Sequence, residues 1–203
     1  MKRALIYLGS TILLALLPLL TTSCSEDASA NPAQSTAVAD AAAQLQRGEY
    51  LVNFGGCNHC HTPMIMGKNG PELDMTRRLS GHPKQIVMPE PPKMKEPWGW
   101  SAALTNTAFA GPWGISYAKN LTPDQVSGLG IWTEEMFLKT MRTGKHMGVS
   151  RPILPPMPWE NLNHLNDQDL KAIYAYLRSL KPIRNEVPDP VIAPPPPAPA
   201  AKG

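Results

Sequence analysis

The pentapeptide Cys57-Asn58-His59-Cys60-His61 has the spacing Cys-x-x-Cys-His. Two thiols separated by two residues can lie on one turn of chain and add to the two vinyl groups of a single porphyrin, forming two thioether bonds. The histidine directly after the second thiol then falls beneath the ring, where its imidazole can bind the iron. The spacing therefore predicts one covalent haem c, attached through Cys57 and Cys60, with His61 as the proximal ligand.

Two other functions of a Cys-x-x-Cys pair fit this sequence less well. A structural zinc site uses four Cys or His ligands, and the chain has no second Cys-x-x-Cys or His-x-x-x-His pair. A thioredoxin-type dithiol is expected within a βαβ unit, which the flanking sequence does not suggest. Asn58 and His59 only fill the spacer between the thiols, and we expect both to be solvated.

The N-terminus predicts export. Lys2 and Arg3 precede an apolar run over residues 4–20, which has the charge and hydropathy pattern of a signal peptide. The run ends in Leu20-Thr21-Thr22-Ser23-Cys24, which resembles a bacterial lipoprotein cleavage box except that Thr21 stands where that family has leucine. We therefore expect a lipoprotein-type signal peptide over residues 1–23 and lipidation of Cys24, which also accounts for the odd third cysteine.

Two other outcomes for the N-terminus remain open. Cleavage after Ala28-Ser29-Ala30, a small-x-small site, would release a soluble periplasmic protein. An uncleaved run would be near the short limit of about 17 residues for a membrane-spanning helix. Haem c is attached outside the cytoplasm in bacteria, so the motif and the signal both indicate the periplasmic side of a bacterial membrane.

Composition limits the partners and marks the ends of the folded region. The formal net charge falls from +3 to +1 when residues 1–23 are removed, because that segment contains two basic residues and no acidic one. This balance does not predict nucleic-acid binding. Residues 24–39 are small and polar and are expected to be a flexible tether. Residues 188–203 include four consecutive prolines and are expected to be a Pro-rich disordered tail.

Residues 40–187 are expected to form one all-α domain. Helical spacing of small and apolar residues predicts helices over residues 40–54, 133–144 and 166–180. Thr133 and Asn166 are the expected N-caps of the second and third helices, and Gly144 is the expected end of the second. The segment Thr122-Pro123-Asp124-Gln125 has the pattern of a capping box and predicts a further short helix.

This order of elements resembles the class I c-type cytochromes. The resemblance extends over residues 40–187 and is most specific to the monohaem cytochrome subunits, and their relatives, of bacterial periplasmic dehydrogenases. It implies a cytochrome c-like fold in which the first and last helices cross beside the haem, with Gly48 allowing the close backbone approach. The segments that carry it are Arg47-Gly48-Glu49-Tyr50-Leu51-Val52, Asn120-Leu121-Thr122-Pro123-Asp124, Gly128-Leu129-Gly130-Ile131-Trp132-Thr133 and Pro156-Met157-Pro158-Trp159.

The resemblance also implies that Met157 is the distal iron ligand. A thioether is a soft, neutral ligand that favours ferrous iron and raises the reduction potential. Prolines on both sides of Met157 stiffen its loop. Met157 could instead be an ordinary core residue. The other candidate ligands are Met147, His146 and His164. Trp132 and Trp159 are expected to pack on the porphyrin or on the helix crossing.

Residues 62–119 depart from this family as a long loop insertion without clear periodicity, and the sequence assigns them no function. Their basic residues could form a docking patch for an acidic redox partner, although interspersed acidic residues favour an ordinary solvated surface. The basic residues in question are Arg77, Arg78, Lys84, Lys93 and Lys95.

The predicted function is transfer of single electrons outside the cytoplasm, with no catalytic residue in the chain itself. The donor would be a dehydrogenase or a quinol-linked protein, and the acceptor an oxidase or another cytochrome. One alternative is a haem subunit that stays within a larger dehydrogenase complex. Another is a haem enzyme or gas sensor, which needs an open distal position and is disfavoured by methionine ligation.

Overall fold

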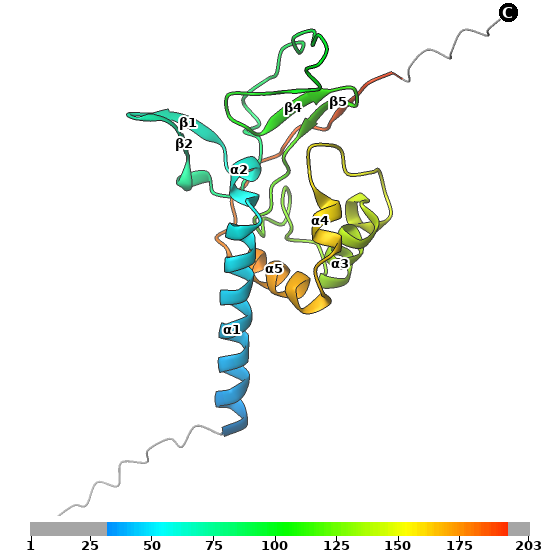
Figure 1. Ribbon diagram of the computed structural model, residues 1–203. Helices are drawn as coiled ribbons and strands as arrows, with labels where there is room; N and C mark the ends of the chain where they lie inside the picture. The colour runs from blue at the N-terminus through cyan, green and yellow to red at the C-terminus, as the bar shows by residue number, and fades with distance from the viewer. Residues whose placement is uncertain (1–31, 195–203) are drawn as a thin grey trace, which may run out of the picture.

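This computed structural model describes residues 32–194. The first and last helices of this region cross and pack together (Figure 1). Helix α1 spans Pro32–Phe54 and helix α5 spans Asp167–Ser179. A Cβ atom on Gly48 of α1 would lie 2.0 Å from the carbonyl oxygen of Ala172 on α5. The close approach expected at Gly48 is therefore present, and any larger residue there would force the helices apart.

Helix α1 begins at Pro32 rather than near residue 40, so it replaces the last part of the expected tether. Proline is well suited to the first helical turn, where its missing amide costs no hydrogen bond, and the alanines that follow favour helix. The side chains of residues 36–47 are exposed, and this end of the helix extends away from the core (Figure 1). The predicted signal peptide and Cys24 lie outside the described residues.

The predicted helix ends are confirmed at three positions. The Oγ1 atom of Thr133 accepts a hydrogen bond from the Met136 amide at 3.1 Å and caps α3, which spans Glu134–Thr143. Gly144 ends that helix with a φ of 63°. The Oδ1 atom of Asn166 accepts from the Asp169 amide at 2.8 Å and caps α5. Two shorter helical segments lie between α3 and α5, namely η2 (His146–Gly148) and α4 (Trp159–Asn163).

The short helix predicted at Thr122 does not form, and the segment is a series of turns. The Thr122 hydroxyl donates to Oδ1 of Asn120 at 2.8 Å and accepts from the Ile183 amide at 3.0 Å. It is therefore occupied by partners outside the expected capping box. The Asp124 carboxylate instead accepts a hydrogen bond from the Ser127 amide at 2.8 Å.

The all-α prediction holds for the core of the domain but not for the insertion. Strands β1 (Met64–Gly67) and β2 (Gly70–Leu73) form a hairpin, followed by the 3-10 helix η1 (Met75–Arg77). A second antiparallel sheet contains β3 (Ser101–Ala102), β4 (Ala108–Gly111), β5 (Gly114–Tyr117) and β6 (Val191–Ile192), in that order. Strands of two to four residues are too short to produce a detectable alternation of polar and apolar residues, which is why the sequence did not predict them.

Strand β6 lies within the segment expected to be a disordered tail. Val191 pairs with Ile115 of β5, and the Ala193 amide donates to the Trp113 carbonyl at 3.0 Å. A Cβ atom on Gly114 would lie 1.9 Å from the Val191 carbonyl oxygen, so the pairing requires glycine at that position. Residues 195–203, which contain most of the consecutive prolines, lie outside the described residues.

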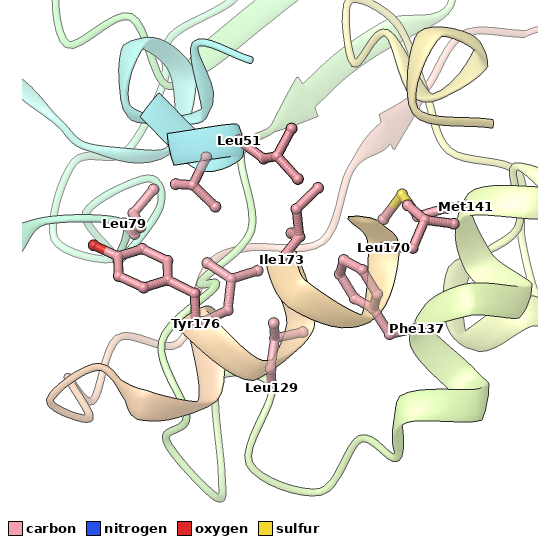
Figure 2. Close-up of a cluster of buried hydrophobic side chains, with 10 residues drawn as sticks. Leu51, Leu79, Leu129, Phe137, Met141, Leu170, Ile173 and Tyr176 are labelled. Carbon is pink, nitrogen blue, oxygen red and sulfur yellow. The ribbon is translucent and has the colours of Figure 1, made fainter. Parts of the chain in front are cut away.

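The hydrophobic core forms where α1, α3 and α5 meet, and its side chains converge from these helices and the intervening loops (Figure 2). Cys57 and Trp132 pack against this core. The attachment motif therefore adjoins the hydrophobic core. Within residues 32–194, no helix has both the length and the apolar character needed to span a bilayer. The buried core residues are Leu51, Val52, Leu79, Leu129, Phe137, Met141, Leu170, Ile173, Tyr176 and Leu177.

Candidate haem-attachment site

Helix α2 (Cys57–His61) presents the whole motif as a single helical segment directly after α1. Gly56, with a φ of 68°, adopts the left-handed conformation that separates the two helices. Cys57 and Cys60 are half-buried and are not joined by a disulfide, while His61 is only 8% exposed. The fold therefore brings together the two thiols and the imidazole that the sequence predicts to act jointly.

Burial favours the protonated form of both thiols. It raises the pKa of Cys57 to about 11 and also raises the pKa of Cys60. Metal binding and disulfide exchange both use the thiolate, so these surroundings disfavour a zinc site or a redox dithiol. Addition to haem vinyl groups requires reduced cysteines, and neither Cys57 nor Cys60 is in a disulfide.

The ring of His61 is oriented by a backbone carbonyl of the insertion. Its Nδ1 atom lies 2.7 Å from the carbonyl oxygen of Lys119, which can only accept, so Nδ1 carries the proton. Burial lowers the pKa of His61, outweighing the opposite effect of that carbonyl, and keeps the ring neutral. Among the described residues Nε2 has no hydrogen-bond partner. The imidazole can therefore bind a metal through the Nε2 lone pair.

The backbone of His61 is held by Gly81. The Gly81 amide donates to the His61 carbonyl at 2.8 Å. Gly81 has a φ of 79°, and a Cβ atom there would lie 2.4 Å from the Ala118 carbonyl oxygen. Only glycine combines this positive φ with the absence of a Cβ atom. Through Lys119 and Gly81, the insertion thus holds His61 at its ring and at its backbone.

The spacer residue Asn58 is not simply solvated, as the sequence suggested. Its Oδ1 atom accepts from the Thr62 hydroxyl at 3.1 Å and from Nε of Arg78 at 3.2 Å. Arg78 also donates to Oδ1 of Asn53 at 3.1 Å and to the Tyr176 hydroxyl at 2.7 Å. One guanidinium therefore ties the attachment turn to the end of α1 and to α5. His59, the other spacer residue, is exposed as expected.

The five basic residues considered for a docking patch differ in their contacts within the domain. Arg78 is committed to these internal contacts, and Arg77 forms an ion pair with Asp74 at 2.7 Å. Lys84, Lys93 and Lys95 are exposed. The ordinary solvated surface that the sequence favours over a docking patch stays a prediction.

Met157 lies in the loop before α4 and is half-buried. The Ser116 hydroxyl of β5 donates to the Pro155 carbonyl at 2.6 Å, and the Trp159 amide donates to the Met157 carbonyl at 2.9 Å. The Trp159 ring fills the space beside Gly144, where a Cβ atom would lie 2.4 Å from it. The loop is therefore held on both sides of Met157.

The other histidines and methionines differ in their surroundings. His164 is exposed, whereas His146 and Met147 are half-buried in η2, with the His146 ring 5.3 Å from that of Trp132. His82, which the sequence did not single out, is fully buried. Its Nδ1 atom contacts the Thr107 hydroxyl and its Nε2 atom the Ile86 carbonyl, both at 2.9 Å. With both ring nitrogens engaged, His82 is not available as a ligand.

Sequence reasoning missed the residues that hold the motif in place. Gly81 and Lys119 act through backbone groups, which every residue type possesses, so their identity gives little warning of the contact. The one nearby signal is the segment Asn120-Leu121-Thr122-Pro123, which carries the resemblance and directly follows Lys119. Two free thiols, a neutral histidine with an available nitrogen and an adjoining apolar core together fit a covalent haem c.

Comparison with known proteins supports the same assignment. Residues 45–181 match the family model for cytochrome c. One of the subunits of the nicotinate dehydrogenase of Pseudomonas putida is 29% identical over 147 residues, covering 72% of this chain and 9% of that protein. The fructose dehydrogenase cytochrome subunit of Gluconobacter japonicus is 28% identical over 155 residues, with coverages of 76% and 25%. The cytochrome c subunit of the quinone-dependent alcohol dehydrogenase of Gluconobacter oxydans is 28% identical over 150 residues, with coverages of 72% and 24%. The chain thus spans a quarter or less of the length of these relatives.

Proposed function

Because the chain belongs to the cytochrome c family, whose domain carries a covalent haem c, we propose that it transfers single electrons on one such haem. The observation that carries the proposal is the arrangement in α2, where two free thiols and a neutral, oriented His61 lie on one short helix. When bound, the haem supplies an iron that changes between two oxidation states. The chain supplies the attachment, the ligands and the exclusion of water.

In this proposal Cys57 and Cys60 form the thioethers and His61 binds the iron through Nε2. The hydrogen bond from Nδ1 to the Lys119 carbonyl fixes the ring and increases the basicity of the coordinating nitrogen. The network around Arg78 holds the attachment turn against α1 and α5. Together these contacts hold the His61 ring and the attachment turn in place, and a ligand that moves little on a change of oxidation state would favour rapid electron transfer.

Met157 is proposed as the distal ligand. It is supported by the resemblance and by a loop that is fixed by Ser116 on one side and by Trp159 on the other. A methionine in that position leaves no open site for substrate or gas, which distinguishes a carrier from a haem enzyme or sensor. His146 and Met147 are the half-buried alternatives, and His164 is the exposed one.

The proposed partners are a dehydrogenase or quinol-linked donor and an oxidase or cytochrome acceptor. Two of the relatives described above are named as cytochrome subunits of dehydrogenases, which supports a carrier role rather than a catalytic one. The same names favour the alternative in which the chain is a lasting subunit of such a complex. We propose that the cytochrome c domain lies on the periplasmic side of a bacterial membrane. It was expected at residues 40–187 with the insertion at 62–119, and α1 and β6 extend it at both ends.

Visible spectroscopy of the purified protein tests the proposed function. We expect the spectrum of a low-spin c-type haem in both oxidation states, with complete and reversible one-electron cycling. Addition of carbon monoxide to the reduced protein or cyanide to the oxidised protein should change neither spectrum at once, because both axial positions are filled. Rapid binding of either ligand to a high-spin iron would instead support the enzyme or sensor alternative.

The membrane attachment of the mature protein gives a further prediction. If Cys24 is the lipidated first residue, mass spectrometry of the mature N-terminus should find Cys24 carrying acyl chains. Two or more chains give stable anchoring, since one alone is marginal. The protein should remain with membranes in high salt, and a Cys24→Ser variant should lose this lipid. A mature chain beginning at Asn31 would show soluble secretion instead.

A further inference from the structure

The segment that follows α5 is bound, through Asn185, to the residues on either side of Gly81. Asn185 is 8% exposed, and its Nδ2 atom donates to the carbonyls of Ser80 at 2.7 Å and His82 at 2.8 Å. Its Oδ1 atom accepts from the Lys84 amide at 3.1 Å. One buried amide therefore fixes the short stretch whose central residue, Gly81, donates to the His61 carbonyl.

The same segment also binds the residue that orients the His61 ring. The ammonium of Lys119 donates to the carbonyl of Pro188 at 2.9 Å and lies 3.4 Å from that of Val187. It lies 3.6 Å from the carboxylate of Asp189. The backbone carbonyl of Lys119 is the group that accepts the Nδ1 proton of His61. Both groups that hold His61 are thus connected to one stretch of chain.

We propose that residues 183–189, here called the C-terminal strap, position the proximal histidine by holding Gly81 and Lys119 in place. The inference rests on the proposed function, because it takes His61 to be the iron ligand. Asn185 and Lys119 are positioning residues that act through the hydrogen bonds to His61. The strap thereby sets the strength of the Nδ1 hydrogen bond, and with it the electron density that the imidazole supplies to the iron.

The chemistry of the contacts distinguishes a positioning role from simple coverage of the core. An apolar tail could shield the same surface without fixing its register. The Asn185 amide instead satisfies two buried carbonyls, which must meet a donor at a defined place or lose their hydrogen bonds. The pairing of β6 with β5 then secures the far end of the strap.

The test compares Asn185→Ala with Asn166→Ala in the full-length, haem-loaded protein. Both variants remove one asparagine amide, but the contacts of the Asn166 amide are to Asp169 at the start of α5, and Asn166 lies outside the strap. We expect the His61 Nδ1 proton to exchange with solvent about tenfold faster, or more, in Asn185→Ala than in the parent protein. NMR of the reduced protein measures this rate. The reduction potential of Asn185→Ala should also rise, because a weaker hydrogen bond makes the imidazole less basic and favours ferrous iron. Asn166→Ala should change neither quantity.

A second variant covers the possibility that Asn185→Ala does not fold. Lys119→Met removes the ammonium from a half-exposed position and keeps the backbone carbonyl that contacts His61. It too should accelerate exchange of the Nδ1 proton. The potential is not the readout for this variant, since loss of a charge shifts it directly. If the folded variants exchange the Nδ1 proton at the rate of the parent protein, the proposed role of the strap is wrong and the proposed function is unaffected. Absence of iron-ligated His61 in the parent protein would overturn both.

Discussion

Replacing Met157 with alanine is expected to open the distal iron position. The oxidised parent protein should show the weak far-red absorption of a sulfur-to-iron bond, and Met157→Ala should lack it. The reduction potential should fall substantially, within the roughly 0.8 V range that axial ligands span, because the variant loses a ligand that favours ferrous iron. Cyanide and carbon monoxide should then bind the variant readily. Absorption spectra, ligand titrations and potentiometry measure these changes.

Met147→Ala is the matched control for this experiment. Both methionines are half-buried, and truncation of either side chain removes apolar packing. Lost packing alone lowers the stability of the fold without changing the coordination of the iron. Met147→Ala should therefore keep the far-red band and a closed distal site. A spectrum of Met157→Ala equal to that of the parent would move the distal ligand to Met147 or to a histidine.

The double variant Cys57→Ala/Cys60→Ala is expected to lose covalent haem completely. Acid-acetone extraction should leave the haem on the parent polypeptide, with one haem per chain, and should leave none on the double variant. Each single variant should retain one thioether and therefore some covalent haem. Complete loss is expected in the double variant because Cys57 and Cys60 carry the only thiols in the described part of the chain, and both are free of disulfide bonds.

Cys24→Ser provides the control for a general effect of removing a cysteine. It leaves the attachment motif unchanged and should keep one covalent haem per chain. Mass spectrometry of the intact polypeptide after extraction measures all four variants directly. Covalent haem on the double variant would contradict the assignment of Cys57 and Cys60.

Local features of the chain were well predicted from sequence. Thr133, Gly144 and Asn166 end or begin helices as expected, because capping depends on a side chain and the amides within three residues of it. The prediction at Thr122 was wrong for the complementary reason. Its hydroxyl is engaged by Ile183, a residue distant in sequence that no local pattern could have indicated.

The insertion and the C-terminal strap were predicted least well. The insertion forms short strands, supplies Arg78 to the attachment turn, and supplies Gly81 and Lys119 to His61. Residues 183–189 bind this insertion, and β6 begins two residues after them, at Val191. The composition of the tail, rich in proline, suggested only an extended conformation, and an extended chain is also what pairs with the edge of a sheet.

The sequence by itself determined the attachment chemistry of this protein, because the spacing of two thiols and a histidine is a property of five consecutive residues. It also determined α3, whose ends Thr133 and Gly144 mark, and Gly48, where α1 and α5 cross. Only the tertiary structure decided which carbonyl orients His61, which guanidinium holds the attachment turn and which segment secures both. These contacts join residues far apart in the chain, and several of them use backbone groups common to all residues, so they leave no pattern in the order of the side chains.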